Sequence, residues 1–208
     1  MLRRPALTHV LVAALAIPAA GRAEGRAPPP SAVFIPFTFV QGGLSSSFLL
    51  HADSLCPEGD AACPIGGGGG IFFGYGRRYL PEREWLVAYD LTVRNARNIF
   101  ASATLQQVRV EHRWVLWTTR TNFEAFAGVH GGLAVYGERF GAITAGLALG
   151  GSVGVSYNLS AFFNLGLIAR VEALRFLPFD TGDGVLRSDG GIATVSGTLH
   201  LALGYHYR

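Results

Sequence analysis

The sequence predicts an all-β fold, an eight-stranded antiparallel up-and-down transmembrane β-barrel with long external loops and short periplasmic turns. Large apolar residues alternate with small, polar or charged ones, and successive side chains of a strand point to opposite faces. The alternating segments exceed the roughly 5–6 residues of an ordinary strand and match the roughly 9–11 that a membrane-spanning strand needs. Their number is even, as in bacterial single-chain barrels.

Two segments precede the predicted barrel. Residues 1–23 have the pattern of a secretory signal peptide, with Arg3 and Arg4 ahead of an apolar stretch over 7–16 and small residues at the end. Residues 24–31 are a polar, proline-rich leader, and residues 32–208 form the barrel domain. Removing the signal leaves 14 basic and 14 acidic residues. A chain of balanced charge is not expected to bind nucleic acid.

The strands follow one another along the chain. The first is predicted at 32–41, with Val33, Ile35, Phe37 and Phe39 on one side. Because Pro36 cannot donate to a sheet ladder, the segment 44–52 could instead hold this strand, or extend it. Strands two to four are predicted at 71–79, 84–94 and 104–118. Strands five to seven lie in the segments 121–140, 141–158 and 160–172, and the last strand spans 191–207.

The loops hold the remaining sequence features. The first external loop contains Cys56 and Cys63, which we expect to form a disulfide, since an exported chain lives where disulfides persist. The glycine run 66–70 in the same loop lacks the Lys-Ser/Thr of a phosphate-binding loop. Residues 175–190 form a second long loop.

Aromatic residues gather near the predicted strand ends, where amphipathic rings would meet lipid headgroups. The periplasmic girdle is predicted to contain Tyr75, Tyr79, Trp85, Trp114, Tyr157, Tyr205 and Tyr207. The opposite rim is predicted to carry Phe100, Phe140, Phe176 and Phe179.

Charged residues occupy the face opposite the large apolar one, and this face also carries most of the glycines. By this parity the lumen receives Glu84, Asp90, Arg94, Arg109, Glu111, Arg113, Glu124, His130, Glu138, Arg170, Glu172 and His200. An eight-stranded barrel has just enough interior for its own side chains, and buried charges must be paired. The pattern therefore predicts a salt-bridged plug. A narrow proton or ion path through the same groups is the alternative.

Two other architectures compete with this prediction. Gly146, Gly150 and Gly154 recur every four residues in the uncharged stretch 140–169, as in a glycine-zipper transmembrane helix. A helix, however, would mix large and small residues that here separate at period two. A soluble ligand-binding barrel would have an apolar interior and a polar exterior, which is the reverse of the observed distribution.

Two segments resemble known proteins. Gly74–Pro81 (GYGRRYLP) and Leu201–Arg208 (LALGYHYR) are similar to the small eight-stranded outer-membrane β-barrel families, the group of OmpA-type transmembrane domains, OmpX and OmpW-like proteins. The resemblance implies the outer membrane of a Gram-negative bacterium, contact with outer-membrane lipid, and recognition of the C-terminal strand by the barrel-assembly machinery.

The functional expectation follows from the fold and the resemblance together. We expect a structural role, or binding of a surface ligand through the external loops Gly42–Gly70 and Arg175–Gly190, without catalysis, cofactor or metal. One alternative is a lipid-active enzyme, for which His112 on the lipid face is the candidate residue. The other is a narrow channel for small apolar solutes.

Overall fold

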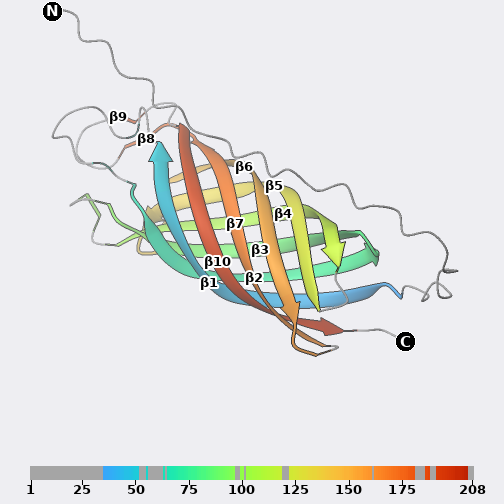
Figure 1. Cartoon of the computed structure of the whole chain (residues 1–208). Coiled ribbons are helices and arrows are strands. Elements are labelled where there is room, and N and C mark those ends of the chain that lie inside the picture. The colour runs from blue at the N-terminus through green and yellow to red at the C-terminus, as the bar shows by residue number, and fades with distance from the viewer. Residues whose placement is uncertain are drawn as a thin grey trace, which may run out of the picture. The chain divides into compact units, whose positions relative to one another are not determined.

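The computed structural model describes residues 35–51, 55, 63, 65–96, 99–100, 102–118, 122–160, 162–180, 186–187 and 191–205. Within these residues a closed barrel is formed by β1 (Phe37–His51), β2 (Gly68–Leu80), β3 (Arg83–Arg94), β4 (Ala103–Thr118), β5 (Phe123–Glu138), β6 (Thr144–Asn158), β7 (Phe163–Phe176) and β10 (Gly191–Tyr205) (Figure 1). A two-stranded ribbon, β8 (Phe179–Asp180) and β9 (Leu186–Arg187), lies between β7 and β10 in the sequence.

Each barrel strand pairs antiparallel with its neighbours, in the order β1-β10-β7-β6-β5-β4-β3-β2. The first and last strands close the ring in a register that runs from Thr38 opposite Tyr205 to Leu49 opposite Thr194. Closure leaves no unpaired strand edge, which a protein in lipid requires. The predicted eight-stranded antiparallel barrel is confirmed.

The two ends of the barrel differ in their connections. We call the end that holds the starts of β1, β3, β5 and β7 the turn end; its connections are short, as at Pro81–Glu82. The opposite end, which we call the loop end, carries the connections 52–67, 95–102, 139–143 and 177–190. Arg139 and Phe140 turn the shortest of these loops with φ values of 46° and 70°. Short and long connections therefore alternate as the sequence predicted, and the short connection 139–143 is the exception that the sequence also predicted.

The first strand is one continuous strand, β1, that contains half of the segment 32–41 and nearly all of 44–52, so the second segment extends the first. Pro36 lies just before β1, so its missing N–H breaks no ladder bond. Gly68–Gly70 extend β2 and pair with Ser45–Ser47. A Cβ on Gly70 would lie within 2.0 Å of the Leu91 carbonyl oxygen, so a glycine is needed at this close approach. The predicted external loop Gly42–Gly70 is accordingly wrong at both ends and shortens to 52–67.

The other predicted loop and the helix alternative are also corrected. Arg175 and Phe176 belong to β7, so the second long loop begins after Phe176 and includes the β8–β9 ribbon. Residues 144–158, which hold the four-residue glycine repeat, form β6 and not a helix. Among the described residues, no helix is long and apolar enough to cross a membrane.

The outside of the barrel is apolar over every strand. Large side chains such as Leu44, Leu133 and Leu149 are about two-thirds exposed, although they would be buried in a soluble protein (64–66% exposed). A continuous apolar outer surface on strands of 12–16 residues suits a hydrocarbon environment.

An apolar cluster fills the barrel at the loop end. Leu105, Ala134, Tyr136 and Leu174 contribute from the strands, and Leu55, Ile65 and Phe179 from the connections. Phe176 and Phe179 are almost fully buried in this cluster, and Phe100 packs against it. The predicted second girdle is therefore wrong for these three residues, whose rings close the mouth of the barrel. Phe140 alone of that set is exposed.

Candidate functional site: the barrel lumen

The interior has three layers along the barrel. At the loop end lies the apolar cluster described above, which we call the cap. The middle contains a network of ion pairs, and the turn end opens into a cavity of about 470 Å³, which we call the vestibule. A second, very small cavity of about 20 Å³ lies among the ion pairs.

A chain of alternating charges crosses the lumen. It runs in the order Glu124, Arg78, Glu84, Arg113, Glu111, Arg109 and Asp90. Arg78 donates to Glu124 at 2.8 and 3.1 Å and to Glu84 at 3.0 and 3.1 Å. Every charge in this chain has at least one partner of opposite sign, which offsets the cost of removing it from water.

Arg113 is the centre of this chain. Its Nε and Nη2 donate to the two oxygens of Glu111 at 2.7 and 3.2 Å, a bidentate contact. Its Nη1 lies 3.5 Å from Glu84 and 3.3 Å from the Gln41 amide oxygen. The guanidinium also stands 4.7 Å from the centre of the Phe126 ring. One side chain on β4 thereby connects β1, β3 and β5 across the lumen.

A second group of polar residues faces this chain from β7 and β10. Arg170 donates to the Thr198 hydroxyl at 2.9 Å, and Glu172 accepts from Gln107 at 2.9 Å. The ring of Phe72 is fully buried, and its centre lies 5.3 Å from the guanidinium of Arg170 and 5.8 Å from that of Arg109. An aromatic ring attracts cations at these distances, so Phe72 offsets part of the cost of burying two like charges.

Glycines make room for these large interior side chains. Each faces a bulky inward residue directly across a ladder: Gly76 opposite Phe39, Gly154 opposite Phe126, Gly150 opposite His130, Gly166 opposite His200, Gly132 opposite Arg109 and Gly128 opposite Arg113. A Cβ on Gly76 would lie 2.4 Å from the Phe39 ring. Alternation of small and large residues is how a narrow barrel fills its interior.

The structure places the twelve predicted lumen residues on inward-facing strand positions. Glu84, Asp90, Arg94, Arg109, Glu111, Arg113, His130, Arg170 and His200 are buried, and Glu124, Glu138 and Glu172 are half-buried. Glu138 is the last residue of β5, at the loop end, apart from the ion-pair chain. Arg94 reaches the loop connection and donates to the Gly66 carbonyl at 3.2 Å.

Sequence reasoning missed Arg78, Gln41 and Phe72. Arg78 follows Arg77, so two adjacent charges left its face undecided. The signal was present nonetheless, because Phe72, Gly74, Gly76 and Arg78 share one parity while large apolar residues hold the other. Gln41 was the last residue of the first placement of strand one and shared the parity of its apolar residues, so it was not assigned to the lumen.

The predicted girdle lies on the outer surface where the structure describes it. Tyr75, Trp85, Trp114 and Tyr157 are exposed, and Tyr157 packs on Phe123 with ring centres 4.8 Å apart. His112, half-buried, lies between Trp114 and Tyr79, with ring centres 4.7 and 6.3 Å away. The Tyr205 side chain, Tyr207 and Cys56 lie outside the described part of the chain. The disulfide to Cys63 therefore stays a prediction.

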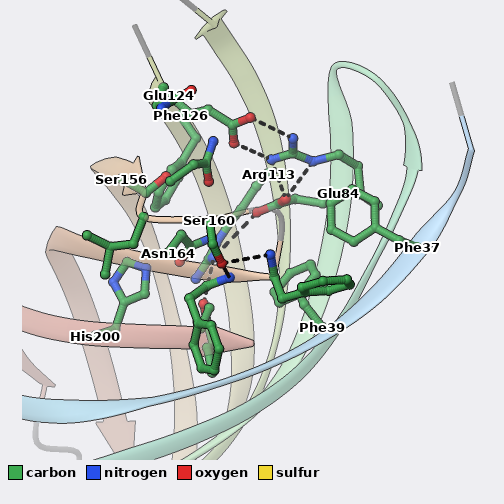
Figure 2. A pocket seen from close by; sticks show the side chains of 18 residues that line it. Phe37, Phe39, Glu84, Arg113, Glu124, Phe126, Ser156, Ser160, Asn164 and His200 are labelled. Carbon is green, nitrogen blue, oxygen red and sulfur yellow. Dashed lines mark hydrogen bonds and ion pairs between the residues drawn. The ribbon is translucent and has the colours of Figure 1, made fainter. Parts of the chain in front are cut away.

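The vestibule is lined by residues from the turn ends of several strands (Figure 2). Phe37 and Phe39 come from β1, so the apolar face predicted for the first strand turns inward and not toward lipid. Arg78, Glu84 and Arg113 form the inner wall, where the ion-pair chain begins. Asn164 and His200 lie on the other side of the cavity from Phe37 (Figure 2).

Comparison with solved structures agrees with this geometry. The neisserial surface protein A is similar over 80% of this chain and 96% of its own, with 14% identity and a TM-score of 0.60. The outer membrane protein OprG from Pseudomonas aeruginosa matches over 83% and 97% of the two chains at 8% identity and a TM-score of 0.54. The outer membrane protein AlkL matches over 89% and 97% at 13% identity and a TM-score of 0.52.

The chain has the fold of the small eight-stranded outer-membrane β-barrels. The resemblance predicted from the sequence is thereby confirmed at the level of the fold. Neither a protein-family model nor a curated protein sequence matches this chain. Identities this low transfer architecture and not activity.

Proposed function

We propose that this protein is an integral outer-membrane protein of a Gram-negative bacterium, with a closed lumen, that acts without catalysis as a structural element and as a scaffold for its surface loops. The observation that carries the proposal is the closure of the lumen at two levels. The ion-pair chain fills the middle, and the cap fills the loop end.

The middle of the lumen leaves little space for a solute. The cavity among Asp90, Arg109 and Glu172 measures about 20 Å³, close to the roughly 10–15 Å³ that one water molecule needs. Asp90 and Arg109 form an ion pair in its wall, and Glu172 accepts from Gln107 at 2.9 Å, so moving these side chains aside would break buried polar contacts. These features support a plug and argue against a path for small apolar solutes.

The cap gives the loop end a fixed base. Arg187 on β9 is buried and donates to the Leu55 carbonyl at 2.7 Å, which joins the two long connections to each other. Leu55 and Phe179 both pack into the apolar cluster below. Loops held on a rigid scaffold are where binding surfaces usually form. We therefore assign surface recognition to the connections 52–67 and 177–190.

The C-terminal strand β10 is the reason for proposing the barrel-assembly machinery as a partner. β10 pairs with β1 from Ala193 to Tyr205, and this pairing closes the barrel. Its outward residues Leu199, Leu201 and Leu203 are exposed and apolar. Recognition of this strand by the barrel-assembly machinery is part of the proposal.

Planar-bilayer recording tests the closed lumen. Protein shown to be folded by its shift in gel mobility on boiling is inserted into a bilayer, and no stable conductance is expected. An Arg109→Ala/Arg113→Ala double variant in the same bilayer serves as the matched comparison, because it removes two side chains that cross the lumen. Stable channels formed by the wild-type protein would contradict the proposal that the lumen is closed.

Incubation with labelled outer-membrane lipid tests the absence of catalysis. His112 contacts the aromatic rings of Trp114 and Tyr79, which resembles a girdle position more than a nucleophile's partner. No lipid product is expected. Product formation that is lost in a His112→Ala variant would replace this proposal with a lipid-active enzyme.

A further inference from the structure

The vestibule is a polar-aromatic cavity that the closed-lumen function does not use. Its volume of about 470 Å³ falls within the range of roughly 300–1,000 Å³ that small-molecule sites occupy. It is blind, because its inner wall is the Arg78–Glu84–Arg113 part of the ion-pair chain. A ligand can therefore enter and leave only at the turn end.

Three residues that line this cavity carry a buried polar atom without a partner among the described residues. The Gln41 amide nitrogen, the Asn164 amide oxygen and His200 Nδ1 make no hydrogen bond within the described part of the chain. Gln41 and His200 are 4% and 3% exposed. Seven other such atoms belong to Arg94, Arg109, His130 and Arg170 in the middle of the lumen, so an unpaired atom alone does not mark the vestibule. Gln41, Asn164 and His200 contribute to the site as polar side chains of its lining. Their three atoms include one donor, one acceptor and one ring nitrogen that can act as either.

The charges in the wall cancel. Glu84 and Glu124 are paired with Arg78 and Arg113, which leaves no net charge for an ionic ligand to neutralise. Phe39 and Phe126 are buried beside these pairs, and Phe37 lies at the mouth. Asn122, Asn158 and Ser156 add further amide and hydroxyl groups. The wall thus combines flat apolar surfaces with neutral donors and acceptors.

We infer that the vestibule binds a neutral sugar unit of a glycan. Sugar hydroxyls donate and accept at the same position, and the C–H face of a pyranose ring packs on an aromatic ring. A neutral peptide offers similar groups, but peptides usually bind to barrels and sheets by adding a strand to a free edge, and this barrel has no free edge. The inference goes beyond the proposed function and rests on it for one point, the orientation of the barrel, which makes the periplasm the source of the ligand.

Ligand binding by the full chain in lipid nanodiscs tests this inference. The probes are N,N′-diacetylchitobiose, a neutral disaccharide, and N-acetyl-trialanine amide, a neutral peptide of similar size. Binding is measured by saturation-transfer NMR and by calorimetric titration. The disaccharide is expected to bind and the peptide is not.

Three variants locate the site. Asn164→Ala removes an amide group from the lining and is expected to weaken binding of the disaccharide about tenfold. Ala202→Leu extends an apolar side chain into the vestibule and is expected to abolish binding. Ser45→Ala alters the small middle cavity instead and is expected to leave the affinity unchanged. The shift in gel mobility on boiling confirms that each variant is folded.

Three outcomes would overturn the inference. The first is binding of the peptide without the disaccharide. The second is equal loss of affinity in Ser45→Ala and Asn164→Ala. The third is no binding of either probe at tens of millimolar. None of these depends on conductance or lipid turnover, so failure here is distinguishable from failure of the proposed function.

Discussion

Replacing Arg113 with Met should destabilise the barrel more than any change at an exposed arginine. Arg113 is 2% exposed and makes the bidentate contact with Glu111, which is fully buried. Removing one partner of a buried ion pair costs about 3–5 kcal/mol, because the other charge is left without compensation. The Met side chain keeps most of the apolar stem, so the loss reports the charge and not the packing.

The contacts that remain set the size of this loss. After the substitution, Glu111 still accepts from Ser152 at 2.6 Å and lies 3.6 Å from Arg109. Glu84 keeps its contacts with Arg78. We therefore expect a loss of unfolding free energy near the lower end of the range, about 3 kcal/mol.

The double variant Glu111→Leu/Arg113→Met separates the cost of leaving one charge unpaired from the net contribution of the whole ion pair. Replacing a whole buried ion pair with apolar residues of similar size is often close to neutral. We expect the double variant to be more stable than Arg113→Met alone, with a coupling energy of about 1–3 kcal/mol. Ser152 loses its acceptor in the double variant, which limits the recovery.

Denaturant unfolding in lipid vesicles measures both effects. The chain has three tryptophans, whose fluorescence reports transfer out of the bilayer. Arg83→Met, at an exposed arginine at the start of β3, is the matched control and should change the free energy by less than about 0.5 kcal/mol. A cost below about 1 kcal/mol for Arg113→Met, or a double variant less stable than the single one, would refute the buried ion-pair chain.

Two further predictions concern packing and orientation. Gly76→Ala should lower the free energy of unfolding by about 1–3 kcal/mol, because the added methyl group overpacks against Phe39. Gly197→Ala is the control and should lower it much less, because an added Cβ there meets nothing within 4 Å. Comparable losses for the two variants in vesicle unfolding would contradict the packing argument. A cysteine at Arg139, on the loop end, should react with a membrane-impermeant maleimide in intact cells, and one at Glu82, on the turn end, should not. The reverse labelling would invert the proposed orientation.

The fold was predictable because its main signal is local. Side-chain direction alternates strictly along a strand, so large residues on one parity identify the lipid face without knowledge of the partners. This is why Glu111, Arg113 and Arg170 could be assigned to the interior from sequence. The predictions failed where the alternation along a strand allowed two assignments of its inward face. In β1 both parities contain phenylalanine, and Phe39 turns inward because Gly76 on the neighbouring strand leaves room for its ring.

The individual ion pairs could not be predicted from the sequence, because no single segment shows which residues meet across the lumen. Arg78 on β2 and Glu124 on β5 are 46 residues apart, and their strands are not neighbours in the sheet. They meet because the ring closes with a lumen narrow enough for two long side chains to span it. The same closure brings Gln41, Asn164 and His200 to one cavity from three strands. Parity therefore predicts which residues enter the lumen, whereas strand register and barrel diameter decide which of them meet and which remain without a partner.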